Sequence, residues 1–364
     1  MTQPTLFDVF IVGAGPAGCA VALSLAQTVP GLRVAIADPG RSTPFRIGES
    51  VPPLIKPFLD QLGVGAAFLQ DNHCPSFRTV SAWGSPELVS NEFFLNVHNT
   101  GWRLDRARFD QTLLNAARQQ GAQRLPAQLH TLSHHAPYWH IGCGDAGDYR
   151  ATYLIDASGR TALPSRLAGL KPINHDRLVA SAVFFGQTDP DLPNADAVLT
   201  EACPDGWWYT AALPEGRRVV ALMTDADLTR RLKAKQLAAW QQQLAQTRHV
   251  QPLIGNARPL APPQLWPANS RYLHGPARPD LLAVGDALSC FDPLSSQGII
   301  KALRSGLFAA YALTDYIRRQ DSSGFTRYQA LMQREFAAYQ TTLSDYHRQE
   351  QRWPDAPFWQ RRLG

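Results

Sequence analysis

Short apolar runs, glycine turns and helical segments alternate along the first forty residues. Residues 7–12 (FDVFIV) form a continuous run rich in β-branched and aromatic side chains, as expected of a parallel strand buried on both faces. Small and apolar residues from 16 to 28 predict a helix, and residues 32–38 (LRVAIAD) return to strand character. This order of strand, glycine turn, helix and strand predicts half of a doubly wound α/β sheet.

Later segments extend the same pattern. Asp105 is a favourable helix N-cap, and the apolar residues after it recur at a spacing of four, which predicts a helix through residue 120. Residues 151–156 (ATYLID) and 281–284 (LLAV) predict two more buried strands, and a long amphipathic helix follows the second. These elements belong to the sheet that begins at residue 7.

A proline-rich, tryptophan-bearing stretch from about 172 to 270 interrupts these elements and carries its own predicted helix near 227–246. It predicts a second, inserted domain. We therefore expect an α/β, Rossmann-like nucleotide-binding domain, an inserted and mostly β substrate domain, and a helical C-terminal region. The predicted boundaries are 1–75, 100–171 and 271–320 for the first domain, 76–99 and 172–270 for the second, and 321–364 for the third.

The composition of the 364 residues, 45% hydrophobic and 18% charged, excludes wholesale disorder. No run reaches the roughly 18 apolar residues of a membrane span, and the N-terminus lacks the basic start and apolar core of a secretory signal. We therefore expect a cytoplasmic protein with no membrane partner.

The charge is mildly positive, with 35 Lys and Arg against 30 Asp and Glu, and no basic stripe predicts a nucleic-acid partner. The five cysteines form no CxxC pair, and the histidines between 130 and 140 match no standard ligand spacing. We therefore expect no metal site.

The strongest local motif is GAGPAG at residues 13–18, which follows a predicted strand and opens a predicted helix. In such a fingerprint the first glycine permits a tight turn, the second lets a pyrophosphate approach the backbone, and the third allows close helix–strand packing. The helix N-terminus supplies free N–H groups for the anion, and an acidic residue after the next strand accepts hydrogen bonds from the ribose hydroxyls. The predicted dinucleotide contacts are Gly13, Gly15, Ala17, Gly18 and Asp38.

The fingerprint near the N-terminus and three later segments resemble flavin-dependent aromatic hydroxylases. These segments are 102–106 (WRLDR), 156–160 (DASGR) and 285–287 (GDA). The resemblance implies FAD as the cofactor and an FAD-binding domain of the group A monooxygenase and halogenase type. We expect an external reductant, either NAD(P)H bound transiently or a separate reductase.

The resemblance also implies further cofactor contacts. Arg106 lies in the arginine segment, and Gly285 with Asp286 forms the second flavin motif, whose aspartate holds the ribityl hydroxyls in that family. Pro293 and the helix start at Gly298 are expected beside the flavin ring.

Residues 48–53 (GESVPP) resemble the GE(A/S)xxP loop of flavin-dependent tryptophan halogenases, and 292–298 (DPLSSQG) stands where that family has PLESTG. The resemblance implies that Ser50 contacts the cofactor and makes Glu49 the nearest ionisable candidate for catalysis. Halogenation itself is disfavoured, because the family's lysine maps onto Arg78 and its glutamate position is Ser295.

Residues 292–306 and the tail RWPDAPFW at 352–359 resemble flavoprotein maturases of tryptophylquinone-containing oxidases. This resemblance implies an FAD-dependent monooxygenase that hydroxylates an aromatic ring, namely a tryptophan side chain in the precursor of a quinone-containing oxidase. Two alternatives stay open: a small-molecule aromatic hydroxylase, and a non-catalytic FAD-bearing assembly factor for such a precursor.

The inserted domain contains one aromatic segment with two possible roles. Its three side chains could pack in a core or could line a substrate cleft near the flavin, and both roles are equally consistent with the sequence. The three residues are Trp207, Trp208 and Tyr209, and in the second role they are the predicted substrate-cleft residues.

Overall fold

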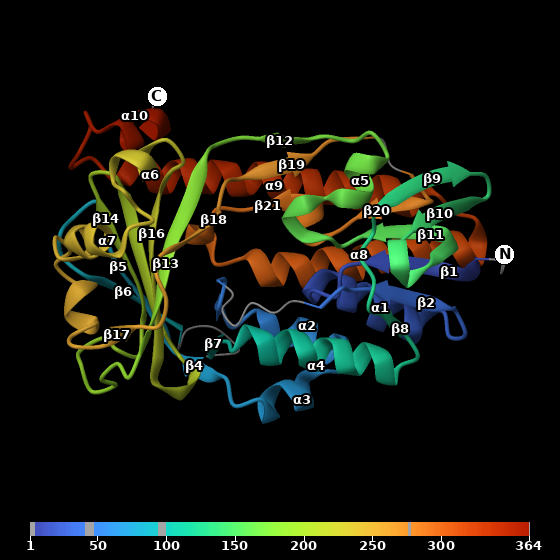
Figure 1. The fold of residues 1–364 in the computed structure, drawn as a ribbon, viewed down its shortest axis with the longest axis horizontal. Coiled ribbons are helices and arrows are strands. Elements are labelled where there is room, and N and C mark those ends of the chain that lie inside the picture. The colour runs from blue at the N-terminus through green and yellow to red at the C-terminus, as the bar shows by residue number, and fades with distance from the viewer. Residues whose placement is uncertain (1–3, 41–46, 94–99, 276–277, 364) are drawn as a thin grey trace.

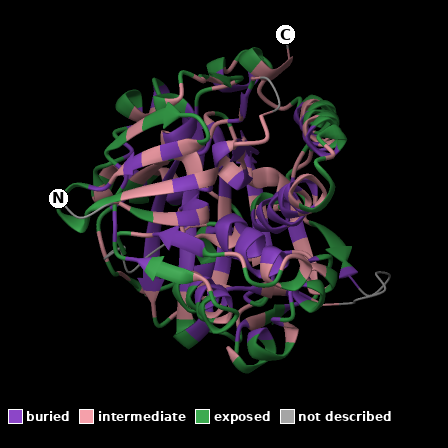
Figure 2. Cartoon of the chain, turned by 90° about the vertical axis from the view of Figure 1, so that its right-hand side faces the viewer, coloured by how far each residue is buried: buried purple, intermediate pink, exposed green. Residues whose placement is uncertain are grey.

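The computed structural model describes residues 4–40, 47–93, 100–275 and 278–363 (Figure 1). Two large sheets lie toward opposite ends of an elongated molecule. Helices α8 (Gly298–Arg319) and α9 (Ser323–Gln349) run lengthwise between them. Buried residues fill the interior between the strands and these helices, as Figure 2 shows.

The first sheet has seven strands in the order β8-β2-β1-β11-β10-β9, with β20 also paired to β11. Pairing is parallel among β8, β2, β1, β11 and β20, whereas β10 and β9 form an antiparallel extension. The carboxyl ends of the parallel strands therefore meet at one edge, where ligands bind in folds of this kind. The strands are β1 (Thr5–Val12), β2 (Val34–Ala37), β8 (Gln123–Leu125), β9 (Thr131–His135), β10 (Tyr138–Gly142), β11 (Asp148–Asp156) and β20 (Leu281–Ala283).

Helix α1 (Pro16–Thr28) packs closely on α8 because small residues line the contact. A Cβ atom on Gly306 of α8 would lie 2.5 Å from the carbonyl oxygen of Ala17, so only glycine permits this approach. Helix α4 (Arg106–Gln119) covers the same layer and begins as predicted, with the Asp105 carboxylate accepting the N–H of Arg108 at 3.0 Å.

The second large sheet has eight strands in the order β17-β13-β16-β15-β14-β5-β6, with β18 also paired to β13. Most of its pairing is antiparallel, and its central strands are buried along nearly their whole length. The strands are β5 (Arg78–Ala82), β6 (Val89–Glu92), β13 (Leu178–Gly186), β14 (Val198–Cys203), β15 (Gly206–Leu213), β16 (Arg217–Asp225), β17 (Arg258–Pro259) and β18 (Gln264–Pro267).

The prediction of a single helix near 227–246 is wrong, because the structure has two short helices there. Helix α6 (Leu228–Arg231) ends before Lys233, which adopts a left-handed conformation with φ +51°, and α7 (Leu237–Leu244) begins after it. A lysine with positive φ does not continue an α-helix. The sequence pattern did not reveal this break.

Two three-stranded sheets and the remaining helices join the layers. One sheet, β3-β7-β4, lies between α4 and the eight-stranded sheet. The other, β12-β19-β21, lies beside α9. These elements are β3 (Ser50–Val51), β4 (Cys74–Ser76), β7 (Gly101–Arg103), β12 (Pro172–Asn174), β19 (Arg271–Leu273), β21 (Ser289–Cys290), α2 (Ile55–Gln61), α3 (Gly65–Gln70), α5 (Leu163–Leu167) and α10 (Pro357–Leu363).

None of the helices in the described ranges combines the length and the apolar character that a membrane crossing requires.

Candidate functional site

The turn after β1 has the backbone geometry that a bound pyrophosphate requires. Gly13 has φ +113°, and a Cβ atom there would lie 2.3 Å from the carbonyl oxygen of Ala157. A Cβ atom on Gly18 would lie 2.1 Å from the carbonyl oxygen of Gly13. In contrast, among the described residues no atom beyond the chain neighbours lies within 4 Å of a Cβ atom on Gly15, the N-cap of α1, and no described side chain caps this helix. The open space and the free N–H groups at Gly15 fit an anion.

The two glycine motifs, far apart in the sequence, meet in space. Gly285 has φ +59°, and a Cβ atom there would lie 2.7 Å from the Cβ of Ala17. The N–H of Gly285 donates to the Ser305 hydroxyl on α8 at 2.8 Å. Ala17 is therefore a packing neighbour of the second motif, and its small size permits the two turns to approach.

Asp38 directly follows β2 at the carboxyl edge of the first sheet. Its N–H donates to the carbonyl of Leu125, and its carboxylate pairs with Arg124 at 3.2 Å. The position is the one expected for a ribose contact, and that role stays a prediction.

Asp286 is flanked by two cations. Its Oδ1 accepts from the Nζ of Lys301 at 2.8 Å, and its Oδ2 lies 3.9 Å from the Nε of Arg160. Desolvation would raise the pKa of Asp286, but Lys301 and then Arg160 outweigh it and hold the pKa below its usual value. The carboxylate is thus kept ionised, as a hydrogen-bond acceptor for hydroxyl groups must be.

Lys301 is a candidate site residue that the sequence analysis missed. Its side chain is only 1% exposed, and its ammonium also donates to the Ser289 carbonyl and lies 5.1 Å from the centre of the Phe291 ring. A buried lysine is rare unless it is paired. The signal available in the sequence was a lysine within the apolar GIIKAL segment at the start of α8.

Arg106 holds the loop that contains Glu49. Its Nη1 donates to the carbonyls of Ile47 and Gly48 at 3.1 and 3.0 Å, and its Nη2 pairs with Asp110 at 3.3 Å. The arginine therefore fixes the backbone of this loop from the first residue of α4.

Glu49 is a buried carboxyl group with one unpaired oxygen. Its side chain is 2% exposed, and its Oε2 accepts the N–H of Gly48 at 3.0 Å. Its Oε1 has no hydrogen-bond partner among the described residues. Burial raises the pKa of Glu49 to about 7, although Arg106 opposes the shift. Such a group exchanges a proton near neutral pH.

Residues 292–298 form a tight turn that leads into α8. Asp292 accepts the N–H of Leu294 at 2.8 Å, and the Ser295 hydroxyl donates to the Asp292 carbonyl at 2.9 Å. Pro293 begins this turn, and Ser296 has φ +49°. In the described ranges, no atom beyond the chain neighbours lies within 4 Å of a Cβ atom on Gly298, the first residue of α8. The space and the free helix start fit a ligand at this position, and Ser50 on β3 stays a predicted contact.

The aromatic segment on β15 does not form one wall. Successive side chains of a strand point to opposite faces, and Trp208 packs edge-on against Trp240 of α7 while Trp207 packs against Trp83 on the other face. Trp207 and Trp208 are 0% and 1% exposed, which places both in the hydrophobic core. Of the three, only Tyr209 keeps partial exposure.

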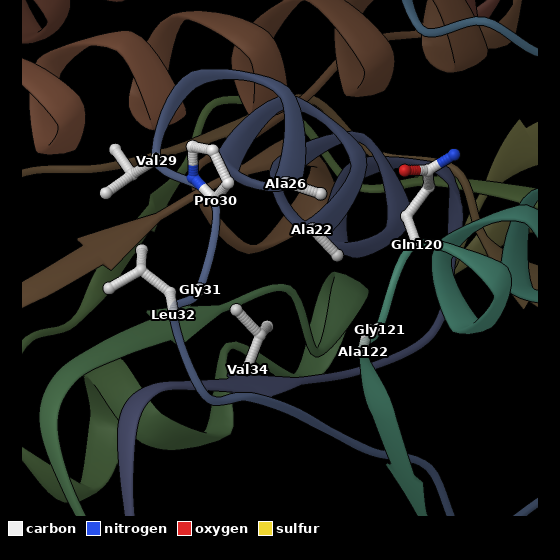
Figure 3. A pocket seen from close by; sticks show the side chains of 10 residues that line it. All are labelled: Ala22, Ala26, Val29, Pro30, Gly31, Leu32, Val34, Gln120, Gly121 and Ala122. Atoms are coloured by element: carbon white, nitrogen blue, oxygen red, sulfur yellow. The ribbon is translucent and has the colours of Figure 1, made fainter.

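A small pocket of about 200 Å³ lies elsewhere, near the end of α1 and the turn after α4 (Figure 3). Its lining residues are glycines and residues with apolar side chains, except for Gln120. It lies at the end of α1 opposite to Gly15, so it is not part of the site described above.

The family of tryptophan halogenases matches residues 84–363. The putative FAD-dependent oxidoreductase LodB of Marinomonas mediterranea is 32% identical over 98% of this chain and 96% of its own length. The chain belongs to the tryptophan halogenase family. The tryptophan 2-halogenase of Chondromyces crocatus is 24% identical, with 95% of this chain and 69% of that relative covered.

Solved structures of this family have the same fold. The myxobacterial chondrochloren halogenase CndH has a TM-score of 0.89 at 20% identity, covering 99% of this chain and 86% of its own. The peptidyl tryptophan dihydroxylase QhpG, essential for tryptophylquinone cofactor biogenesis, has a TM-score of 0.74 at 24% identity, covering 99% and 79%. The predicted α/β flavoprotein fold is confirmed.

The family assignment makes the chain an FAD-dependent oxidoreductase of the monooxygenase type. The geometry fits this cofactor: the open N-terminus of α1 at Gly15 suits the pyrophosphate, and the ionised Asp286 suits the ribityl hydroxyls. FAD as the predicted cofactor is therefore confirmed.

We expect Lys301→Met to weaken FAD binding about tenfold, because it removes the charge-assisted hydrogen bond that orients and ionises Asp286. The measurement is titration of the FAD-free protein with FAD. Lys301→Arg, which keeps the charge, should recover much of the affinity. Lys56→Met, at an exposed lysine of α2, is the matched control. Unchanged FAD affinity in Lys301→Met would contradict this role.

Proposed function

We propose that this protein is an FAD-dependent monooxygenase that inserts oxygen into an aromatic ring, namely a tryptophan side chain in the precursor of a quinone-containing oxidase. The observation that carries the proposal is the ion pair between Arg78 and Asp196, at 3.1 Å. The sequence resemblance maps the halogenase lysine onto Arg78. Ser295, at the position of the halogenase glutamate, bonds to its own turn. Neither side chain is an acid–base equivalent of the residue it replaces.

One relative supports oxidation without halogenation, and another supports the substrate class. LodB is named as a putative FAD-dependent oxidoreductase rather than a halogenase, and it covers nearly the full chain. QhpG is a peptidyl tryptophan dihydroxylase and shares the fold. A tryptophan side chain within a polypeptide is therefore the substrate that we propose for this chain.

The residues around the cofactor have distinct roles in this proposal. Bound FAD, when reduced, supplies the activation of molecular oxygen. Gly13 forms the tight turn, Gly15 would admit the pyrophosphate, and Asp286 would accept hydrogen bonds from the ribityl chain. The N–H groups at the start of α8, next to Gly298, would stabilise negative charge on a bound flavin.

Glu49 is the group that holds and moves a proton in the proposed reaction. Its unpaired Oε1 is the atom that carries the proton, and a pKa of about 7 lets it exchange that proton near neutral pH. Arg106 positions the carboxyl group by holding the Ile47 and Gly48 carbonyls. Burial of the carboxyl excludes water from it.

The test compares three substrates of the reduced FAD-loaded protein in air: a precursor of a quinone-containing oxidase, free tryptophan and a simple phenol. Chloride and bromide are present, and mass spectrometry reads the products. We expect added oxygen on a tryptophan of the precursor alone and no halogenated product. An oxygen-free incubation is the control, and a tryptophan halogenase run in parallel verifies halogen detection.

Each other outcome identifies another function. Fast hydroxylation of the phenol with an unchanged precursor would make the protein a small-molecule hydroxylase. Binding of the precursor without oxygen-dependent oxidation would make it an assembly factor. A halogenated product would return it to the halogenases.

A further inference from the structure

Arg103 occupies the central strand of the β3-β7-β4 sheet. It pairs directly with Ser50 on β3 and with Cys74 on β4. Because directly opposed residues of a sheet project to the same side, these three side chains share one face. The neighbouring Trp102 belongs to the other face and packs edge-on against Phe68 of α3 at 5.2 Å. Arg103 therefore points away from α3.

The face of the β3-β7-β4 sheet that carries Arg103 lies toward the eight-stranded sheet. Strand β7 contacts β15, which carries Tyr209. The charge of Arg103 is close enough to Tyr209 to counteract part of the rise in the pKa of that phenol, which burial and then Glu49 cause. Arg103 is thus placed between the cofactor-binding layer and the predicted substrate domain, on the side of Glu49 and Tyr209.

The guanidinium of Arg103 is buried and only partly satisfied. Its side chain is 6% exposed, and its Nη2 donates to the Pro75 carbonyl at 2.8 Å. Nε and Nη1 are buried without a hydrogen-bond partner in the described part of the chain, and no carboxylate there lies within ion-pair distance of Arg103. A buried charge of this kind is costly unless a partner compensates it.

Two further guanidinium groups increase the positive charge at this place. Arg218 is 1% exposed and bonds to Thr210 and Ala195, but its Nε is also unpaired among the described residues. Burial, and then Arg103, lower the pKa of Arg218 to about 10. Arg78 is satisfied by Asp196, the carboxylate that also influences both buried arginines. Asp196 is thus ion-paired with Arg78, and its charge also acts on Arg103 and Arg218.

The missing partner has the chemistry of an anion. A neutral carbonyl would satisfy one N–H but leave the charge uncompensated, whereas a carboxylate satisfies both requirements and makes stronger, charge-assisted hydrogen bonds. The anionic pyrophosphate of FAD is accounted for by the N-terminus of α1. The aromatic substrate is the remaining ligand in the proposed function.

We propose that Arg103 binds a carboxylate of the substrate through its free Nε–H and Nη1–H and thereby positions the aromatic ring. The proposal rests on the proposed function only in taking an aromatic substrate. The carboxylate has two possible sources: an acidic side chain next to the target tryptophan in a polypeptide, or the α-carboxylate of a free aromatic amino acid.

The test measures binding of matched probes to the FAD-loaded protein by calorimetry. One pair is N-acetyltryptophan and N-acetyltryptophanamide, which differ in the α-carboxylate. The other pair is capped Asp-Trp and Asn-Trp dipeptides, which differ in a neighbouring side-chain carboxylate. We expect the acidic member of one pair to bind at least about tenfold tighter than its neutral partner, and that pair identifies the source of the carboxylate.

In Arg103→Met this preference should fall to about one, and in Arg103→Lys it should be partly kept. FAD affinity should be unchanged in both variants. Arg327→Met, at an exposed arginine of α9, is the charge-matched control and should keep the full preference. Equal binding of acid and neutral probes by the wild-type protein would overturn the proposal, and so would loss of FAD from Arg103→Met. Neither result depends on whether oxygen insertion occurs.

Discussion

The Gly15→Val variant is expected to fold normally and to lose FAD. Apart from the chain neighbours, no atom of the part of the chain that the structure describes lies within 4 Å of a Cβ atom at this position, and the backbone has φ −74°, which valine readily adopts. The branched side chain would instead occupy the space in front of the α1 N-terminus, where the pyrophosphate binds. We expect purified Gly15→Val to be colourless, with an FAD affinity reduced at least about a hundredfold.

Two glycines of the same motif provide the comparison. Gly13→Ala would place a Cβ atom 2.3 Å from the Ala157 carbonyl oxygen at φ +113°, and Gly18→Ala would place one 2.1 Å from the Gly13 carbonyl oxygen. Both should lower the thermal unfolding temperature of the FAD-free protein, whereas Gly15→Val should not. Stoichiometric FAD in well-folded Gly15→Val would show that the pyrophosphate lies elsewhere.

Parts of the fold and site that depend on local backbone requirements were predictable from the sequence. A fingerprint such as GAGPAG works only at a strand–turn–helix junction, and the structure has β1 and α1 on its two sides. Asp105 caps α4 for the same local reason. These positions follow from the few residues next to them in the chain.

Roles that depend on distant packing were not predictable in this way. Lys301 and Asp286 are fifteen residues apart and meet only because α8 folds back beneath the second glycine motif. Arg103 looked like part of a cofactor segment, but its unpaired donors follow from the burial of β7 against β15. Trp208 could not be assigned to a core or a cleft until the helix covering its face, α7, was known.

Glu49→Gln is expected to stabilise the FAD-free protein, and increasingly so as the pH rises from about 5 to 8. Burial raises the pKa of Glu49 from 4.5 to about 7, so between these values the folded protein binds more protons than the unfolded chain. Stability then falls with rising pH across this window and stays low above it. At pH 8 the wild-type protein bears the full penalty of the buried carboxylate, which amounts to about 3 kcal/mol.

The glutamine variant does not bear this penalty, because a neutral amide keeps the shape and can still accept the N–H of Gly48 through its oxygen. Urea unfolding at pH 5 and pH 8 measures the difference between Glu49→Gln and wild type, which cancels the contributions of other buried acids such as Asp292. Glu215→Gln, at a glutamate whose side chain is 66% exposed, is the matched control and should show no such pH dependence. A difference between Glu49→Gln and wild type that stays constant from pH 5 to 8 would mean that Glu49 ionises normally, and it would then be unsuited to hold a proton near neutral pH. The same variant should lose oxygen insertion while it keeps FAD, because the carboxyl group that moves the proton is gone and the residues that hold the cofactor are unchanged.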